Sequence, residues 1–188
     1  MNRKQQILKT AAQLFKERGY AAVTMRDIAE TMDIKAASLY NHISGKQELL
    51  AHMVLEVAYE FTTGMMEIKV LNESAFAKAE KLIALHIKIA LHYTNALAVM
   101  NTDWMHLEGA AYEEYSDLRK KYEHDFKSIL EAGVARGEFM NGNVDTMLFT
   151  LLSTLRSIYL WIPKKSQEDL QVLKAELPRL LLYGINAS

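Results

Sequence analysis

Cysteine is absent from the 188-residue chain, which excludes disulfides, thiol catalysis and cysteine-ligated zinc or iron–sulfur sites. Only two prolines, Pro163 and Pro178, and eight glycines interrupt it, so the composition favours long helices over a strand-rich fold. No apolar run approaches the ~20 residues that span a bilayer, and none follows Arg3 and Lys4 as in a secretory signal. The sequence therefore predicts a cytoplasmic protein without membrane contact.

Motifs for catalysis and metal binding are also missing. There is no Gly-rich phosphate loop, no G-x-S-x-G elbow and no H-E-x-x-H pair. His86 and His92 are six residues apart, so they would point to different sides of a helix. A metal site would have to be assembled from distant residues, for instance His92, His106 and Glu108. The sequence predicts no enzyme, no cofactor and no metal.

The formal charge of −1 is unevenly distributed along the chain. Residues 1–50 carry eight basic and five acidic side chains, a net charge of +3, which leaves 14 basic against 18 acidic groups, a net charge of −4, in the remainder. A basic end joined to an acidic body indicates nucleic-acid binding, although +3 is a small excess. The charge distribution alone does not decide the function.

Apolar residues recur at three-to-four spacing almost throughout, which is the pattern of amphipathic helices. The first predicted helix covers residues 3–18, where Asn2 and Gln5 form a capping pair and Gly19 is a natural stop. Pro178 falls inside the last helical pattern and is expected to kink or shorten it. The later predicted helices cover about 75–94, 96–107, 111–136, 144–161 and 167–184.

Residues 24–50 carry the most specific pattern in the chain. Thr24 with Asp27 caps a short helix, and Asp33 tolerates the left-handed backbone that a tight turn requires. A second short helix over 36–42 follows, so the segment predicts a helix-turn-helix with 36–42 as the recognition helix. The residues spaced to meet in its small core are Ile28, Ile34 and Leu39.

Ser44 with Gln47 repeats the capping pattern and opens a long helix that continues beyond residue 60. The predicted fold is therefore all-α. A three-helix DNA-binding domain, residues 1–46, is joined by this long helix to a C-terminal helical bundle, residues 47–188, with about nine helices in total.

The recognition helix presents small and polar side chains. Small residues at its start let the backbone approach a groove floor, and Ser38 and Asn41 are suited to hydrogen bonds with base edges. Lys35 stands where a capping side chain would normally be, so a phosphate would meet free backbone N–H groups there. Thr24, Tyr40, His42 and Lys46 are suited to phosphates, although Tyr40 alone would also fit a core and Lys46 a solvated face. The predicted DNA contacts are Thr24, Arg26, Lys35, Ala36, Ala37, Ser38, Tyr40, Asn41, His42 and Lys46.

A set of residues in the first quarter of the chain recurs together in a known family. These are Ala12, Phe15, Gly19, Thr24, Asp27-Ile28-Ala29, Ile34, Leu39-Tyr40, His42, Lys46 and Glu48-Leu49-Leu50. With this set the sequence resembles the TetR family of bacterial transcriptional regulators. The family commonly has glycine where Asp33 stands, a small residue where Met32 stands and phenylalanine where Ile43 stands. Base preference is not implied, because recognition-helix residues vary among members.

The resemblance continues in FKSILEAGVARGEF at 126–139 and in the apolar stretch after it, which look like the regulatory domain of the same family. This implies a homodimer in which helices 144–161 and 167–184 form a four-helix interface with the partner's pair. The first of them is apolar on more than one face, which fits a partner on one side. The alternative is a helix that is central in its own bundle.

A cavity for an effector is the second implication of the resemblance. Arg156 lies in a strongly apolar helix and needs a partner, which is either a ligand carboxylate or phosphate or an internal acidic residue. The ending IYLWIP is similar to members that sense fatty acyl or other lipid-like thioesters, so a lipid-like molecule is one expectation for the unknown effector. The predicted ligand contacts are Met65, Met100, Trp104, Met105, Phe126, Phe149, Arg156 and Tyr159.

The resulting functional prediction is a ligand-responsive homodimeric repressor that binds a palindromic double-stranded operator through residues 36–42. The competing hypothesis is a DNA-bound protein whose helical domain docks a protein partner and senses no small molecule. An open pocket of some hundreds of cubic ångströms would favour the sensor, and a closed, fully packed bundle would favour docking.

Overall fold

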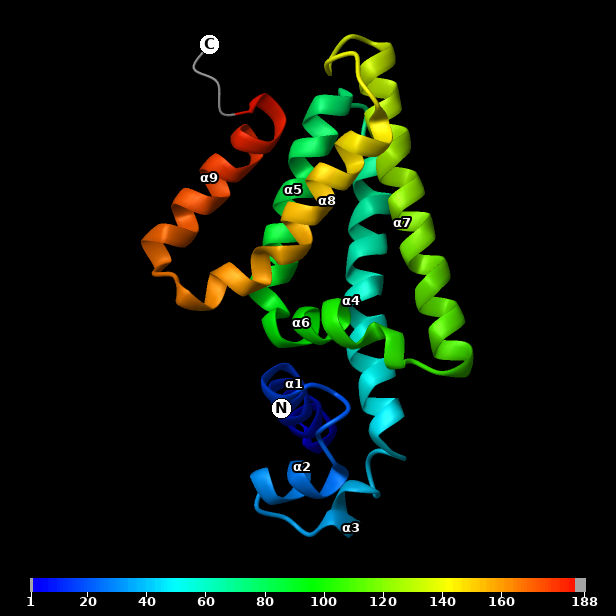
Figure 1. Ribbon diagram of the computed structural model, residues 1–188, viewed down its shortest axis with the longest axis vertical. Helices are drawn as coiled ribbons and strands as arrows, with labels where there is room; N and C mark the ends of the chain where they lie inside the picture. The colour runs from blue at the N-terminus through cyan, green and yellow to red at the C-terminus, as the bar shows by residue number, and fades with distance from the viewer. Residues whose placement is uncertain (1, 185–188) are drawn as a thin grey trace. The chain divides into compact units, whose positions relative to one another are not determined.

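The computed structural model describes residues 2–184, and every regular element in that range is a helix (Figure 1). The α-helices are α1 (Arg3–Arg18), α2 (Met25–Thr31), α3 (Ala36–Leu39), α4 (Lys46–Lys69), α5 (Ala75–His92), α6 (Thr94–Asp103), α7 (Gly109–Ala135), α8 (Val144–Trp161) and α9 (Gln167–Tyr183), with short 3-10 helices η1 (Trp104–His106) and η2 (Ile162–Lys164). The predicted all-α class is confirmed. None of these helices alone is long and apolar enough to cross a membrane, although α5 and residues 94–106, taken together as a bent pair, pass on length and composition.

The described residues form two compact units. The first unit comprises residues 2–58 and 93–117, and the second comprises residues 59–92 and 118–184. Helices α4 and α7 each contribute one end to each unit, so neither unit is a continuous stretch of chain. The predicted domain boundary after residue 46 differs from this division, because α6 and η1 pack with the N-terminal helices.

Helix α1 begins and ends where its capping residues stand. The Asn2 side chain accepts the backbone N–H of Gln5 at 2.9 Å, and the Gln5 side chain accepts the backbone N–H of Asn2 at 2.9 Å. Gly19 then adopts a φ of 81°, and its N–H donates to the carbonyl of Phe15 at 2.8 Å. This conformation favours glycine, so the predicted bounds of 3–18 are confirmed.

The turn between α2 and α3 has the left-handed residue that its sequence predicts. Asp33 has a φ of 52°, and its N–H donates to the carbonyl of Glu30 at 3.1 Å. The next N–H, from Ile34, donates to the carbonyl of Ala29 at 3.0 Å, which closes the turn. Of the three predicted core residues, Ile28 and Leu39 are fully buried and Ile34 is half-buried.

The recognition helix is shorter than predicted. It covers only Ala36–Leu39 instead of 36–42, and the Lys35 side chain does not cap it. The N–H groups of His42 and Ile43 both donate to the carbonyl of Leu39, at 2.9 and 3.0 Å, so residues 40–42 form a turn. A single helical turn has little stability of its own, and the anchor that holds it is the buried Leu39.

The start of α4 is fixed by a different pair from the one predicted. The Ser44 N–H and hydroxyl donate to Glu48 Oε2 at 2.7 and 2.8 Å, whereas Gln47 donates to the carbonyl of His106 at 2.8 Å. The predicted Ser44–Gln47 cap is therefore wrong by one residue. The hydrogen bonds from Ser44, with a further one from Lys4 at 3.0 Å, lower the pKa of Glu48 to about 2.

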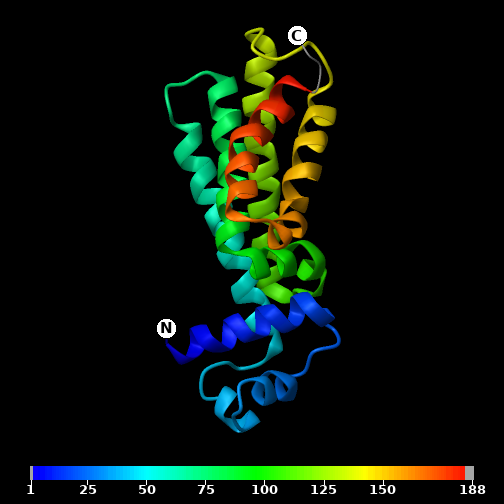
Figure 2. The same cartoon turned by 90° about the vertical axis from the view of Figure 1, so that its left-hand side faces the viewer.

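In the second unit the end of α4 lies lengthwise beside α5 and α7, and both α8 and α9 pack against α5 (Figures 1 and 2). Pro178 does not shorten α9, which continues to Tyr183. The N-cap Ser166 accepts the N–H of Asp169 at 3.1 Å and begins that helix. Large, deeply buried core side chains of the unit include Met65, Leu82, Ile83, Ile87, Phe126 and Leu155.

Gly133 lies so close to its neighbours that a side chain would not fit there without a shift. A Cβ added there would lie 2.2 Å from Cδ2 of Phe139 and 3.0 Å from Cβ of Ala75. Gly133→Ala is therefore expected to lower the free energy of unfolding, since overpacking costs about 1–3 kcal/mol while alanine gains only ~1 kcal/mol in helix propensity. Gly45→Ala is the matched control, because nothing lies within 4 Å of its added Cβ. Equal urea midpoints for the two variants would contradict the prediction.

Candidate DNA-reading surface

The predicted DNA contacts lie in the first unit, on α2, α3 and the residues around them. Tyr40 is 56% exposed, so it is not a core aromatic, and the adjacent Leu39 fills the core instead. Ala36 and Ser38 are half-buried, and Ala37 is exposed. Five other predicted contacts are exposed, and their side chains form no hydrogen bond or ion pair within residues 2–184, so their polar atoms are available to DNA. These residues are Arg26, Lys35, Tyr40, Asn41 and His42.

Thr24 has its polar atoms engaged in the cap of α2. Its N–H donates to Asp27 Oδ2 at 2.7 Å, its hydroxyl also donates to that oxygen, and the hydroxyl accepts the Asp27 N–H at 3.1 Å. These hydrogen bonds hold the pKa of the Asp27 carboxyl below its ordinary value. Thr24 remains exposed, but its two donors serve the helix cap, so its predicted phosphate contact would have to share them.

Lys46 has partners that the sequence did not reveal. Its Nζ donates to the carbonyls of Tyr20 at 2.8 Å and Val23 at 2.9 Å, lies 3.5 Å from that of Ala21, and stands 4.2 Å from the centre of the Tyr20 ring. An ammonium has three N–H donors, so these carbonyls take up its capacity. Lys46 therefore holds the loop between α1 and α2, and its predicted phosphate contact would have to share these donors.

The same loop is held by α6. Asp103 is buried, and its Oδ1 accepts the backbone N–H of Tyr20 at 3.2 Å, while Oδ2 accepts the Thr102 hydroxyl at 2.8 Å. The His106 ring stacks on the Tyr20 ring with centroids 5.4 Å apart. We call Lys46 and Asp103, with residues 20–23 that they bind, the loop clamp. It leads directly into Thr24, where α2 begins.

In the second unit Arg156 has an internal partner. It forms an ion pair with Glu123 on α7, and the Nε of Arg119 donates to the same Glu123 oxygen at 3.1 Å. Burial raises the pKa of Glu123, but the hydrogen bonds from Arg156 and Arg119 outweigh it and hold that pKa below its ordinary value. Of the two partners that the sequence allowed for Arg156, the structure shows the internal carboxylate.

A buried histidine beside this pair was missed by sequence reasoning. His86 Nε2 lies 2.8 Å from the Tyr122 hydroxyl oxygen, and the Phe61 ring packs 4.6 Å from the imidazole. Burial, and then the charge of Arg156, lowers the pKa of His86 to about 3, while burial raises the pKa of Tyr122. Both groups are therefore neutral near pH 7. The available signal was the apolar run IALHIKIA around the histidine.

The predicted ligand contacts are divided between the units. Met100, Trp104 and Met105 belong to the first unit, and the other five belong to the second. Met65 and Phe126 are fully buried, whereas Phe149 is 72% exposed. Tyr159 is buried and Met105 exposed. Nor do three or more histidine, aspartate or glutamate side chains lie together as a metal site in residues 2–184.

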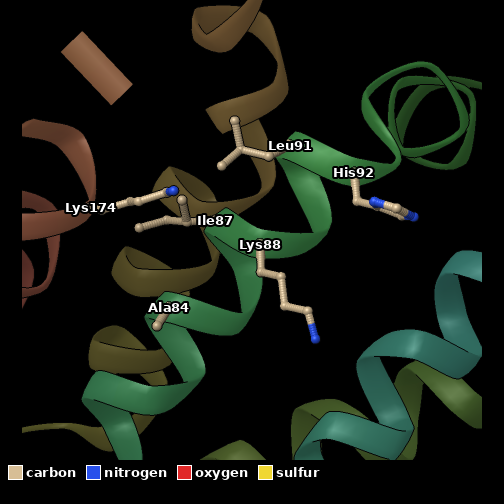
Figure 3. A pocket seen from close by; sticks show the side chains of 6 residues that line it. All are labelled: Ala84, Ile87, Lys88, Leu91, His92 and Lys174. Atoms are coloured by element: carbon tan, nitrogen blue, oxygen red, sulfur yellow. The ribbon is translucent and has the colours of Figure 1, made fainter. Parts of the chain in front are cut away.

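The second unit has a hollow of about 410 Å³ on the face of α5 (Figure 3). Figure 3 shows Lys174 of α9 reaching toward Ile87 from one side, while Lys88 and His92 point to the other side of α5. None of the eight predicted ligand contacts lines it. We call it the α5 hollow, and its lining residues are Ala84, Ile87, Lys88, Leu91, His92 and Lys174.

Comparison with known proteins identifies the family. Residues 72–185 match the tetracyclin repressor-like C-terminal domain, and residues 7–53 match the bacterial regulatory proteins of the tetR family. The chain is 30% identical over 143 residues to the HTH-type transcriptional repressor KstR2 of Mycolicibacterium smegmatis, and 29% identical over 138 residues to KstR2 of Rhodococcus jostii; each match covers 73% of this chain and 68% of the relative.

The solved structures agree on the fold. The ketosteroid transcriptional regulator KstR2 of Mycobacterium tuberculosis matches with a TM-score of 0.90 at 22% identity, over 100% of this chain and 96% of the other. The two family matches together cover most of the described residues, and the helix-turn-helix lies within the match over residues 7–53. The chain therefore belongs to the TetR family of bacterial regulators, and it is a DNA-binding transcriptional regulator.

Proposed function

We propose that this regulator is a homodimeric repressor whose two recognition segments enter successive major grooves of a palindromic operator. The observation that carries the proposal is the set of exposed side chains from Lys35 to His42 that have no partner within residues 2–184. Lys35 supplies charge for a phosphate, and Asn41 has an amide suited to an adenine edge. The loop clamp supports this reading because it fixes the loop that precedes α2.

Dimerisation through residues 144–161 and 167–184 is part of the proposal. Both α8 and α9 expose large apolar side chains, which is costly in water and typical of a surface that a partner covers. A second copy presenting the same two helices would bury these side chains in a self-complementary interface. The exposed apolar side chains are Phe149, Leu160 and Trp161 on α8, and Val172, Leu180 and Tyr183 on α9.

Control by a small molecule completes the proposal. The α5 hollow, at about 410 Å³, lies within the range of about 300–1,000 Å³ that small-molecule sites occupy, which supports a sensor over a protein-docking domain. The effector would lower operator affinity only by its preference for the conformation that does not bind DNA. A coupling of about 1–3 kcal/mol would change operator affinity ~5–150-fold.

Two variants test the DNA-reading surface. The wild-type protein first selects an operator from a random duplex library, and affinity is then measured by fluorescence anisotropy at several salt concentrations. Lys35→Ala is expected to weaken binding to all duplexes and to reduce the salt slope by about one unit for each recognition segment. Asn41→Ala is expected to cost about 1–3 kcal/mol on the selected operator and to change the preferred base, with non-specific binding retained.

The outcomes separate the two roles. If Asn41→Ala lowers the affinity for all duplexes equally, Asn41 does not take part in direct base readout. Failure of the wild-type protein to enrich any duplex would reject the operator-binding repressor itself. Glu30→Ala, an exposed change on α2 outside the proposed contacts, serves as the control and is expected to leave the preferred sequence unaltered.

A further inference from the structure

The α5 hollow lies on the exposed strip of a helix whose opposite side is buried. Eight of the 18 residues of α5 are buried, among them Ile83, His86 and Ala90. Ala84 and Lys88, one helical turn apart, are nonetheless exposed, and Leu91 is half-buried beside them. The floor of the hollow is thus apolar at its centre, where Ala84 presents little bulk and neither Ala84 nor Leu91 has a polar side-chain atom.

The polar groups of the hollow are all basic nitrogens. Its lining includes Lys88, His92 and Lys174 and contains no carboxylate. Lys88 and Lys174 form no ion pair or side-chain hydrogen bond within residues 2–184. Other lysines of the second unit do pair with carboxylates, as in the contacts Lys69–Asp125, Lys81–Glu73, Lys121–Asp125 and Lys127–Asp145. The two lysines of the hollow therefore offer positive charge that no described neighbour neutralises.

We propose that the α5 hollow binds a small amphipathic anion, with an apolar chain on Ala84, Ile87 and Leu91 and a carboxylate or phosphate head at Lys174 or Lys88. The apolar floor favours binding of a hydrocarbon chain, because a polar ligand would lose its hydration there without gaining hydrogen bonds. The basic edges reject a cationic head and attract an anionic one. The site itself stands on this chemistry, and only its regulatory consequence rests on the proposed repressor function.

The geometry also limits the size of the occupant. A volume of about 410 Å³ suits a single small molecule and is too small for a folded partner. Lysine stems lie along apolar surface while their ammonium groups stay at the rim, so the head group would bind at the edge and the chain would bind over the floor. Lys174 from α9 and Lys88 from α5 place such an edge on each side (Figure 3).

The test compares two probes with the same chain length and opposite head charge. Decanoate and decyltrimethylammonium are titrated separately into the full-length protein by calorimetry, each below its critical micelle concentration. Decanoate is expected to bind at one site per chain, and the cation is expected to bind at least tenfold more weakly. Binding of both probes with equal affinity, or no binding of decanoate, would overturn the proposal.

Four variants place the site. Lys88→Gln and Lys174→Gln are each expected to weaken decanoate binding two- to fivefold, as for other partly exposed charges. Ala84→Phe, at an exposed position, is expected to fill the hollow and abolish binding without a change in charge. Lys164→Gln, an exposed lysine on η2 outside the hollow, is the control and is expected to bind as the wild type does. Equal decanoate affinity in all four would place the binding elsewhere and reject this site.

A parallel measurement keeps the two proposals separate. The same proteins are tested for operator binding with and without decanoate, and their helix content is checked by circular dichroism. Selective decanoate binding by a protein that recognises no operator would leave the site standing and reject the repressor function. Operator binding by a protein that does not bind decanoate would reject the anion site and leave the repressor function standing.

Discussion

Between pH 6.5 and about pH 3 the free energy of unfolding is expected to fall by ~5 kcal/mol because of one side chain, His86. Burial and the nearby Arg156 lower the pKa of His86 to about 3, whereas the unfolded chain has the ordinary value of 6.5. In that window the unfolded state therefore binds a proton that the folded state does not. Stability from the neutral imidazole is complete above pH 6.5 and is lost as the pH falls toward 3.

Urea unfolding at half-unit pH steps measures this effect. His86→Gln is expected to flatten the dependence on pH between 6.5 and 4.5, because glutamine does not titrate. His124→Gln, which alters an exposed histidine on α7, is the matched control and should keep the wild-type slope. Below pH 4.5 protonation of Glu48, with its pKa of about 2, adds to the loss in the same direction. A wild-type slope retained by His86→Gln would assign the acid sensitivity to other groups.

Lys46→Ala is expected to lower operator affinity ~10–100-fold while leaving the salt slope unchanged. Two hydrogen bonds from a charged donor, to the carbonyls of Tyr20 and Val23, are lost, and such bonds contribute about 1.5–3 kcal/mol each. The freed carbonyls loosen the loop that leads to Thr24, so the recognition segment is held less firmly. No phosphate contact is removed, and the number of released counterions stays the same.

Anisotropy over a range of salt concentrations separates this outcome from a direct contact. Lys35→Ala serves as the comparison, since it is expected to change the slope. Asp103→Asn provides an independent check on the loop clamp, because it weakens the acceptor for the Tyr20 N–H from α6 without touching the DNA-reading surface. A slope reduced by about one unit for each copy of Lys46→Ala would instead assign Lys46 to a direct phosphate contact.

Local signals predicted the fold well wherever both ends of a helix were encoded by neighbouring residues. Asn2, Gln5 and Gly19 determine α1, and its bounds are as predicted. The recognition helix was predicted too long because its end depends on where backbone N–H groups find acceptors, and Leu39 takes two of them. The cap of α4 was predicted to pair Ser44 with Gln47 because a three-residue spacing is the common one, whereas here Glu48 accepts both hydrogen bonds from Ser44.

Contacts between residues far apart in the sequence could not be predicted from these local signals. The partners of Lys46 are main-chain carbonyls 23 to 26 positions earlier, and the partner of Tyr20 is 83 positions later. A main-chain carbonyl or N–H is present whatever the residue type, so contacts with these atoms produce no sequence motif. The α5 hollow was missed for a related reason, since Lys174 and Lys88 come from helices whose pairing only the fold defines.

The loop clamp has a consequence for how this protein can diversify. Lys46 binds backbone carbonyl oxygens and Asp103 binds a backbone N–H, groups that every residue type except proline possesses in the same place. Substitutions at exposed positions such as Ala21 or Ala22, or along the recognition segment, leave those atoms where they are. Mutation can therefore explore new operator sequences while the scaffold that presents the reading surface is inherited intact.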